Sequence, residues 1–326
     1  MDQPAPALFY TGLVADLYAP LRSGGAPDPR PYIRFVRASG EPALELGCGD
    51  GDPLLDLRAR GLDVEGLDAS SDMLDRCRAN AAARSLAVTL HESTIEAMEL
   101  PRRYRSIYLA GATFNLLPDD DTAWRALARI RHHLEPDGSA LIPLMLPQPV
   151  PEELLGVPRA SVADDGTVIR FSALAVDRDE EARLQTTRTR YEREREGAVE
   201  RLEREWLLHW HTQEGFRQLV SDAGLLVDDL LGFDGQPATP DATTFAFVVS
   251  RDPAFDHNAS VRDRLPPAGR ALAAGMLGLD EAIYGERPKV EIVAEADADG
   301  LDLGDVDLDL EEPSQSRMTI EPEAPT

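Results

Sequence analysis

Apolar residues in the first half of the chain fall into short blocks separated by amphipathic stretches. Short apolar blocks bounded by turn residues indicate buried strands, and we predict them at 43–47, 63–70, 86–93, 104–114 and 139–147. The stretches between them carry helix start and stop signals, and we predict helices at 53–61, 71–85 and 119–138. Ser71 or Asp72 is expected to cap the second helix, and Gly61 and Gly138 to end the first and third. Strands that alternate with helices predict parallel pairing and a doubly wound α/β sheet.

The pattern changes after residue 148. Apolar and polar residues then alternate with period two, which predicts antiparallel strands within 167–177, 181–196 and 199–212. Gly197 is expected to mark a hairpin turn. A charged helix over 190–208 is the alternative, because Glu and Arg favour helices. A helix starting at Thr212 and two further strands, within 227–235 and 243–252, complete a sheet of seven strands.

The globular pattern fades after residue 252. One helix is expected within 267–288, and the segment from Glu291 to Glu312 contains ten acids and no base, which predicts a mostly disordered acidic tail. The start of a calcium-binding loop is imitated at 295–300. However, the twelfth loop position is Val306, where a bidentate Glu is needed, so a solvated tail is the better interpretation.

Charge and composition restrict the partners. The net charge is −26, which argues against nucleic acid and anionic membranes as partners, because both need basic surface. No apolar run approaches a transmembrane helix of about 20 residues, and the N-terminus lacks a signal peptide, so we expect a soluble, cytoplasmic protein. Two cysteines form neither a disulfide framework nor a CxxC pattern. The adjacent His132 and His133 would point apart on a helix, so no metal is expected.

The segment "ELGCGDG", 45–51, places three glycines directly after the first strand. A glycine turn at this place is typical of nucleotide-like ligands. The dinucleotide pattern GxGxxG fails, because its third glycine would fall at Asp52, which also brings negative charge to a pyrophosphate. A nicotinamide oxidoreductase is therefore disfavoured. Acids suit a ligand that carries a sulfonium and an ammonium, which S-adenosylmethionine does.

"ELGCGDG" resembles motif I of class I S-adenosylmethionine-dependent methyltransferases, E/D-x-G-x-G-x-G, and "VEGLDASSDML" resembles that family's second strand, which ends in an acid. Asp68, 17 residues past Gly51, matches the acid. The resemblance spans residues 10–250 and implies a Rossmann-like methyltransferase fold with S-adenosylmethionine as cofactor. It implies a glycine turn under the aminoacyl group, with Glu45 organising it, and ribose hydroxyls bound by Asp68. The implied cofactor contacts are Glu45, Gly47, Cys48, Gly49, Gly51, Asp68, Ala69, Ser70, Met73, Thr94, Ile95 and Gly111.

The resemblance also implies a domain order. We predict N-terminal lid helices over 1–40, a cofactor-binding Rossmann-like half over 41–147, and an antiparallel β insertion over 148–211 that serves as a substrate platform. The closing helix and strands of the sheet occupy 212–252, and an acidic C-terminal extension occupies 253–326. Such a platform and the acidic charge together favour a small-molecule methyl acceptor, with the oligomeric state left open.

Catalytic candidates are fewer, because methyl transfer mainly needs the acceptor to be held close and aligned. His209 or His211 would serve as a base, or both would lie on an exposed strand face. Asn115 would face the acceptor or act as a turn residue. Tyr10 and Tyr18 would close over the cofactor or pack their own helix. The sequence thus predicts methyl transfer to a small-molecule N, O or C acceptor; the alternative is a non-catalytic S-adenosylmethionine-binding or regulatory protein whose acidic tail binds partners.

Overall fold

The structure is a computed structural model that describes residues 5–22, 27–162, 166–232 and 235–255, together with the backbone at 306–307 and 317–318. The chain divides into two units, residues 1–255 and residues 256–326. In the second unit, β12 (Val306–Asp307) pairs antiparallel with β13 (Arg317–Met318). The helix predicted within 267–288 lies outside the described residues, as does nearly all of the predicted acidic tail.

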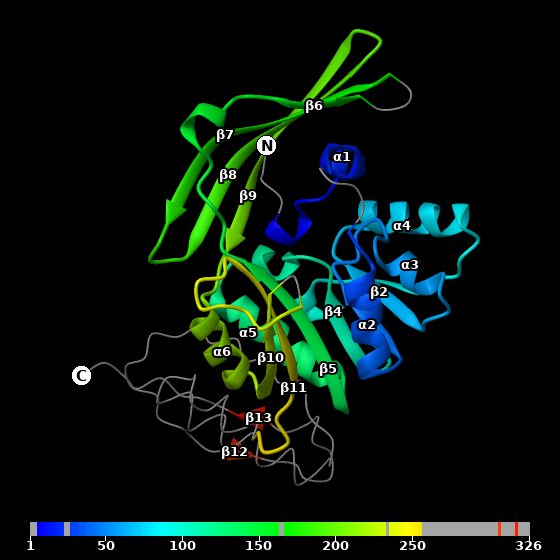
Figure 1. The fold of residues 1–326 in the computed structure, drawn as a ribbon, viewed down its shortest axis with the longest axis vertical. Helices are drawn as coiled ribbons and strands as arrows, with labels where there is room; N and C mark the ends of the chain where they lie inside the picture. The colour runs from blue at the N-terminus through cyan, green and yellow to red at the C-terminus, as the bar shows by residue number, and fades with distance from the viewer. Residues whose placement is uncertain are drawn as a thin grey trace. The chain divides into compact units, whose positions relative to one another are not determined.

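A seven-stranded sheet forms the centre of the first unit (Figure 1). Its strand order is β10-β11-β5-β4-β1-β2-β3, and β11 runs opposite to the other six. This confirms the predicted doubly wound, mostly parallel sheet. Its strands are β1 (Ala43–Leu46), β2 (Val64–Asp68), β3 (Leu90–Glu92), β4 (Tyr104–Leu109), β5 (Leu134–Met145), β10 (Leu225–Leu231) and β11 (Thr244–Arg251).

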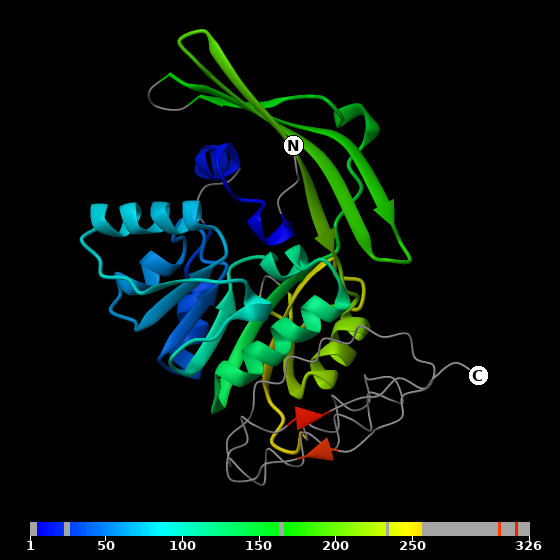
Figure 2. The same cartoon turned by 180° about the vertical axis from the view of Figure 1, so that it is seen from behind.

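Helices cover both faces of this sheet, which explains why its central strands are apolar throughout. All four residues of β1 are buried: Leu44 and Leu46 pack on one face with α5, and Ala43 packs on the other with α2 and α3. α2 lies in front of the sheet in Figure 1, and α5 lies in front in Figure 2, which views the opposite side. The helices are α2 (Arg30–Ser39), α3 (Leu54–Arg58) and α4 (Ser71–Ala83) on one face, and α5 (Asp120–His133) and α6 (Gln213–Asp222) on the other.

A second sheet, called here the platform sheet, follows β5 in the chain. Its four antiparallel strands are β6 (Arg159–Val162), β7 (Val168–Asp179), β8 (Leu184–Arg195) and β9 (Ala198–His209). Glu196 and Gly197 form the β8–β9 turn, both with positive φ, as a type I′ hairpin turn requires. Across this hairpin Arg190 pairs with Glu203 and Arg193 with Glu200. The predicted strands are confirmed, and the alternative helix over 190–208 is wrong.

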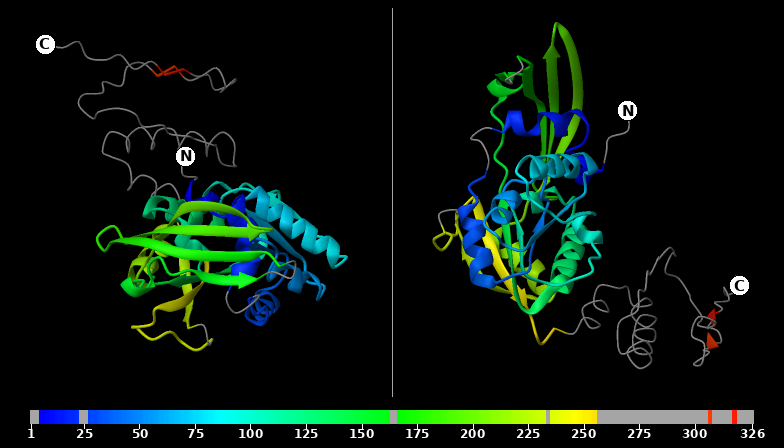
Figure 3. Two further views of the ribbon diagram at one scale, coloured as in Figure 1. Left: turned by 90° about the horizontal axis from the view of Figure 1, so that it is seen from above. Right: turned by 90° about the vertical axis from the view of Figure 1, so that its right-hand side faces the viewer.

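The N-terminal segment packs against the platform sheet (Figure 3). It contains the short helix η1 (Pro6–Leu8) and α1 (Leu13–Leu21). Phe9, Val14 and Leu17 are buried with Ile169 of β7 and Tyr191 of β8 in a separate apolar cluster. The segment also contacts α4, because the backbone N–H of residue 12 donates to a carboxylate oxygen of Asp72 at 2.6 Å. The N-terminal segment therefore joins the platform sheet to the parallel sheet.

Two element ends differ from the prediction. The N-cap of α4 is Ser70, whose Oγ accepts from the Met73 N–H at 3.2 Å, and not Ser71 or Asp72, which are already inside the helix. The third predicted helix ends at His133, and β5 begins with the next residue, so Gly138 lies within a strand. Short helical turns also follow β3, β4 and β5: η2 (Ile95–Ala97), η3 (Thr113–Leu116) and η4 (Glu152–Leu154). None of the described helices is long and apolar enough to cross a membrane.

Candidate functional site

A cavity of about 280 Å³ lies at the carboxyl ends of the parallel strands, where ligands bind in doubly wound sheets. Its wall comes from the turn after β1, the ends of β2 and β5, the loops after β3 and β4, the N-terminal segment and the end of β9. The cavity wall brings together eight of the predicted cofactor residues: Gly47, Cys48, Gly49, Asp68, Ala69, Met73, Thr94 and Ile95. The other four, Glu45, Gly51, Ser70 and Gly111, lie close to the wall in sequence but are not among its residues.

The glycine turn requires glycine for both conformation and space. Gly47 and Gly49 have φ of +68° and +53°, which residues with a Cβ rarely adopt. A Cβ on Gly47 would lie 2.5 Å from Cγ2 of Thr113, and one on Gly49 would lie 3.3 Å from Cε of Met73. The turn is therefore packed against η3 and α4 and presents bare backbone to the cavity. Gly51 serves packing, since a Cβ there would meet Leu55 and the Cys77 sulfur.

Asp68 ends β2 and turns its carboxylate onto the glycine turn. One oxygen accepts from the Gly49 N–H at 2.9 Å and the other from the Ser70 N–H at 2.8 Å. Burial raises the pKa of Asp68, and these N–H donors partly offset that shift. A carboxylate has about four acceptor sites, so Asp68 retains capacity for a ligand. The Ser70 hydroxyl has its single donor occupied, because it donates to the Tyr10 carbonyl at 2.5 Å while it accepts from the Met73 N–H.

Glu45 lies beneath the turn rather than in the cavity wall. Its side chain is fully buried, one oxygen accepts from the Tyr108 hydroxyl at 2.7 Å, and Oε1 has no partner. Burial raises the pKa of Glu45 well above its ordinary value. Cys48, above it, is buried, and its thiol pKa is raised by a hydrogen bond with Cys77 and by burial. The thiol is therefore neutral and unsuited to act as a nucleophile.

The loop after β3 contributes Ser93, Thr94, Ile95 and Glu96 to the wall. Glu96 was not among the sequence candidates. Its Oε2 atom is buried and has no hydrogen-bond partner. A buried acceptor without a donor is costly unless a ligand supplies one. Glu96 lies two residues beyond Thr94, the candidate that the resemblance implied in this loop.

The wall formed by η3, β5 and β9 is largely apolar. It consists of Thr113, Leu116, Leu117, Met145, Trp206 and Leu208. Trp206 carries a buried Nε1–H without a partner. Tyr10 and Tyr18 complete the wall from the N-terminal segment, with ring centroids 5.3 Å apart. Burial raises the pKa of Tyr10 far above neutrality, so its hydroxyl is neutral.

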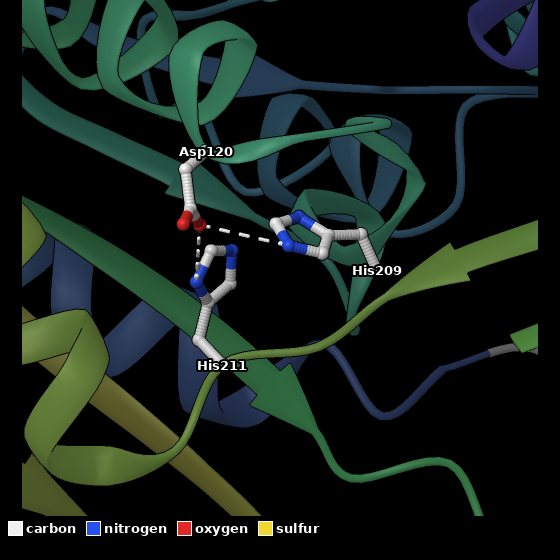
Figure 4. A group of neighbouring side chains, drawn as sticks. All are labelled: Asp120, His209 and His211. Atoms are coloured by element: carbon white, nitrogen blue, oxygen red, sulfur yellow. Dashed lines mark ion pairs between the residues drawn. The ribbon is translucent and has the colours of Figure 1, made fainter. Parts of the chain in front are cut away.

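The three predicted catalytic residues lie behind this wall and are not part of it. Asn115 is fully buried; its Nδ2 donates to the carbonyls of Met145 and His209, and its Oδ1 accepts from the Met145 N–H. His209 and His211 are each 1% exposed, so the interpretation as an exposed strand face is wrong. Both rings face the carboxylate of Asp120 (Figure 4). Burial lowers the pKa of His209, and burial with the neighbouring His209 lowers the pKa of His211 to about 3.

The residues present fit S-adenosylmethionine. The glycine backbone leaves space that a Cβ would fill, Asp68 has free acceptor capacity at the end of β2, and Glu96 has an unpartnered oxygen. The wall contains the carboxylates of Asp50, Asp52, Asp68 and Glu96 and, among the residues that the structure describes, no Lys, Arg or His. Arg22 pairs with Asp50 and Asp52, so Asp68 and Glu96 are the carboxylates that remain to favour a cationic ligand over a pyrophosphate.

Comparison with known proteins places this fold. Residues 43–138 match the family described as a methyltransferase domain. A curated relative, dTDP-3-amino-3,6-dideoxy-alpha-D-glucopyranose N,N-dimethyltransferase of Streptomyces fradiae, is 28% identical over 144 residues, which are 42% of this chain and 55% of the relative. The chain thus spans about half the length of the curated relatives it matches.

Two solved structures are similar over most of the chain. The CcbJ methyltransferase of Streptomyces caelestis is 22% identical with a TM-score of 0.62, covering 75% of this chain and 98% of that one. A S-adenosylmethionine-dependent methyltransferase of Clostridium acetobutylicum is 15% identical with a TM-score of 0.59, covering 73% and 97%. At these identities the likeness shows the fold. Residues 43–138 therefore match the methyltransferase-domain family, and the first unit has the α/β fold of these methyltransferase structures.

Proposed function

We propose that this chain is a S-adenosylmethionine-dependent methyltransferase that acts on a small molecule. The observation that carries the proposal is the single cavity wall in which the glycine turn and Asp68 meet Trp206 and Leu208 of the platform sheet. Such a wall can hold a cofactor and an acceptor side by side. The curated relatives are N,N-dimethyltransferases, so the non-catalytic alternative is not favoured.

We assign a role to each residue at the cofactor end of the cavity, which is the part lined by the glycine turn, Asp68 and the loop after β3. When bound, the cofactor supplies a methyl group on a sulfonium, which the acceptor takes by in-line displacement. The backbone at Gly47 and Gly49 would accommodate the aminoacyl part, Asp68 would accept hydrogen bonds from ribose hydroxyls, and Glu96 would accept one from the adenine amino group. Gly111 lies beyond this wall, where its N–H donates to the Tyr32 hydroxyl at 3.2 Å and positions the loop after β4.

We further propose an amine as the acceptor. The platform part of the wall offers no general base among its described residues, and Tyr10 stays protonated. A hydroxyl acceptor would need such a base, whereas a neutral amine is already nucleophilic. The curated relative from Streptomyces fradiae is named as an amino-sugar N,N-dimethyltransferase, which agrees with this choice. The Trp206 N–H is available to orient the acceptor.

Calorimetry tests the cofactor assignment. Wild-type protein should bind S-adenosylmethionine and S-adenosylhomocysteine, and Asp68→Ala should weaken both at least about tenfold, because a good ligand hydrogen bond to a charged group contributes about 1.5–3 kcal/mol. Asp75→Ala is the matched control, since Asp75 is exposed on α4 and pairs with Arg78 of the same helix. Absence of binding by the wild-type protein would overturn the proposal.

Turnover tests the acceptor assignment. A panel of small primary and secondary amines, amino sugars included, and matched hydroxyl compounds should give S-adenosylhomocysteine and a methylated product with the amines alone. Turnover confined to hydroxyl compounds would contradict the amine proposal and leave the cofactor assignment intact. The negative charge predicts that neither nucleic acid nor an anionic membrane is a partner. The cytoplasmic location also remains a prediction.

A further inference from the structure

Asp120, His209 and His211 form a cluster that the proposed reaction does not use. Asp120 begins α5, His209 ends β9, and His211 lies in the segment before α6. One ligand atom from each lies within 4.8 Å of the other two. Asp120 Oδ1 is 3.6 Å from Nε2 of His209 and 3.6 Å from Nδ1 of His211 (Figure 4). These separations are longer than a hydrogen bond.

The unpaired nitrogens of the two rings require an explanation. His211 is 1% exposed and neither ring nitrogen has a hydrogen-bond partner; Nδ1 of His209 also has none. Buried polar atoms are nearly always paired with protein, water or an ion. The Leu117 backbone forms a hydrogen bond with His209, but His211 lies against the apolar rings of Phe114 and Phe216, at 6.1 and 5.4 Å between centroids, which offer its nitrogens no partner.

We propose that Asp120, His209 and His211 bind a divalent late transition metal ion, with Zn²⁺ as the best fit. Two imidazole nitrogens and one carboxylate oxygen form a ligand set that suits zinc better than magnesium or calcium. Bonds of about 2.1 Å place tetrahedral ligand atoms about 3.4 Å apart, so the two 3.6 Å separations need only a small contraction. A fourth position remains for water.

The ligand Asp120 has the support and the access that such a site needs. Its carboxylate also forms an ion pair with Arg183, from the β7–β8 turn, which orients it as metal-bound carboxylates commonly are. Its side chain is 52% exposed, so an ion can enter from solvent. The sequence suggested no metal, because only the fold brings these three residues together from 90 residues apart.

The bound ion would crosslink the platform sheet to the parallel sheet. His209 and His211 flank the chain where it leaves the platform sheet, and Asp120 belongs to the helix that covers the parallel sheet. Neither histidine lines the cavity, but Leu208, next to His209, does. The site therefore fixes the cavity wall and takes no part in methyl transfer, and the proposal does not depend on the proposed function.

Cobalt binding gives a direct readout. Full-length protein without a histidine tag is stripped with a chelator and titrated with Co²⁺. We expect one equivalent per chain to give the visible absorption of four- or five-coordinate Co²⁺, to be displaced by Zn²⁺, and to raise the thermal midpoint of unfolding. Co²⁺ that gives no such band at millimolar concentration would overturn the proposal and leave a buried histidine pair.

Variants identify the ligands. Asp120→Asn and His211→Phe should lose the band and at least about tenfold in Zn²⁺ affinity, since even supporting residues around a metal commonly account for 10–100-fold. Asp121→Asn is the matched control, because Asp121 is the adjacent exposed acid and pairs with Arg125. Because the Asp120 side chain is partly exposed, we expect Asp120→Asn to fold even if the buried substitution His211→Phe prevents folding. Unchanged metal binding in Asp120→Asn would contradict the assignment.

Discussion

Gly47 links local backbone conformation to the shape of the proposed cofactor site. Its positive φ and the Thr113 methyl both exclude a side chain, whereas Gly61 has a similar φ of +80° and open space around it. We predict that Gly61→Ala costs about 1–2 kcal/mol of unfolding free energy from backbone strain alone. Gly47→Ala should cost a further ~2 kcal/mol from overpacking and should weaken cofactor binding.

Urea denaturation and calorimetry check this pair. Thr113→Ser removes the methyl group that a Cβ at Gly47 would meet. The double variant Gly47→Ala, Thr113→Ser should therefore recover part of the loss but not the strain. Equal losses in Gly47→Ala and Gly61→Ala would show that space at the turn does not matter.

His133 gives a pH dependence whose sign follows from its partners. Nε2 accepts from the Leu100 N–H at 2.9 Å and Nδ1 donates to the Arg129 carbonyl at 2.9 Å, so the folded ring is the neutral Nδ1–H tautomer. Burial lowers its pKa; Arg129 and Arg103 act in the same direction, while the Arg129 carbonyl and Glu99 oppose it. In the unfolded chain the ring takes up a proton near pH 6.5. Stability should therefore be complete above about pH 6.5 and fall as the pH drops toward the folded pKa.

The measurement is the unfolding free energy at pH 8 and pH 5. His133→Gln should be less stable than wild type at pH 8 and should lose less on acidification. A His133→Gln variant with the full wild-type slope would refute the assignment.

Asn115 holds three elements together. Its amide joins η3 to the end of β5 and the end of β9 through three hydrogen bonds: the one to the His209 carbonyl is buried and the two with Met145 are part-buried. We predict that Asn115→Ala lowers the unfolding free energy by about 3 kcal/mol, because the Met145 N–H and two carbonyls lose their partner. Gln148→Ala is the control, since its amide makes an exposed bond to the Leu146 carbonyl. Chemical denaturation that places both variants within experimental error of each other would contradict this.

The elements show which parts of the fold a sequence reveals. Period-two alternation identified the β8–β9 hairpin despite its many Glu and Arg residues, because their charges pair across strands. Element ends were harder to predict. Three polar residues, at 70–72, compete to cap α4, and only the turn after Asp68 decides for Ser70. Similarly, β5 starts before Gly138 because pairing of Leu134 with Tyr104 of β4 overrides the helical pattern.

Across the whole molecule, predictability depends on whether a site is contiguous in sequence. The proposed cofactor end of the cavity comes from a strand, its glycine turn and the next strand, so a local motif names most of the residues that line the cavity there. The platform end comes from residues as distant as Tyr10, Met145 and Trp206. No local pattern joins these segments. The same reason hid the cluster of Asp120 with the two histidines.

One carboxylate, Asp16 of α1, connects these distant parts. It forms ion pairs with Arg76 of α4 and with Arg193 of β8, and all three side chains are about one-third exposed. α1 also supplies Tyr18 to the cavity wall. Exposed pairs contribute at most about 1 kcal/mol each, so Asp16→Asn should barely change stability. The substitution should instead weaken the attachment of the N-terminal segment, which forms part of the cavity wall.

We therefore predict that Asp16→Asn speeds cofactor release by about fivefold at low salt, the factor that corresponds to ~1 kcal/mol. Stopped-flow displacement of S-adenosylhomocysteine measures this rate. The difference from wild type should shrink as the ionic strength rises, since salt screens partly exposed pairs. Asp75→Asn, whose pair with Arg78 lies within α4, should release the cofactor at the wild-type rate. If Asp16→Asn also releases the cofactor at the wild-type rate at every salt concentration, the N-terminal segment does not hold the cofactor in place. Its packing on the platform sheet then serves folding alone.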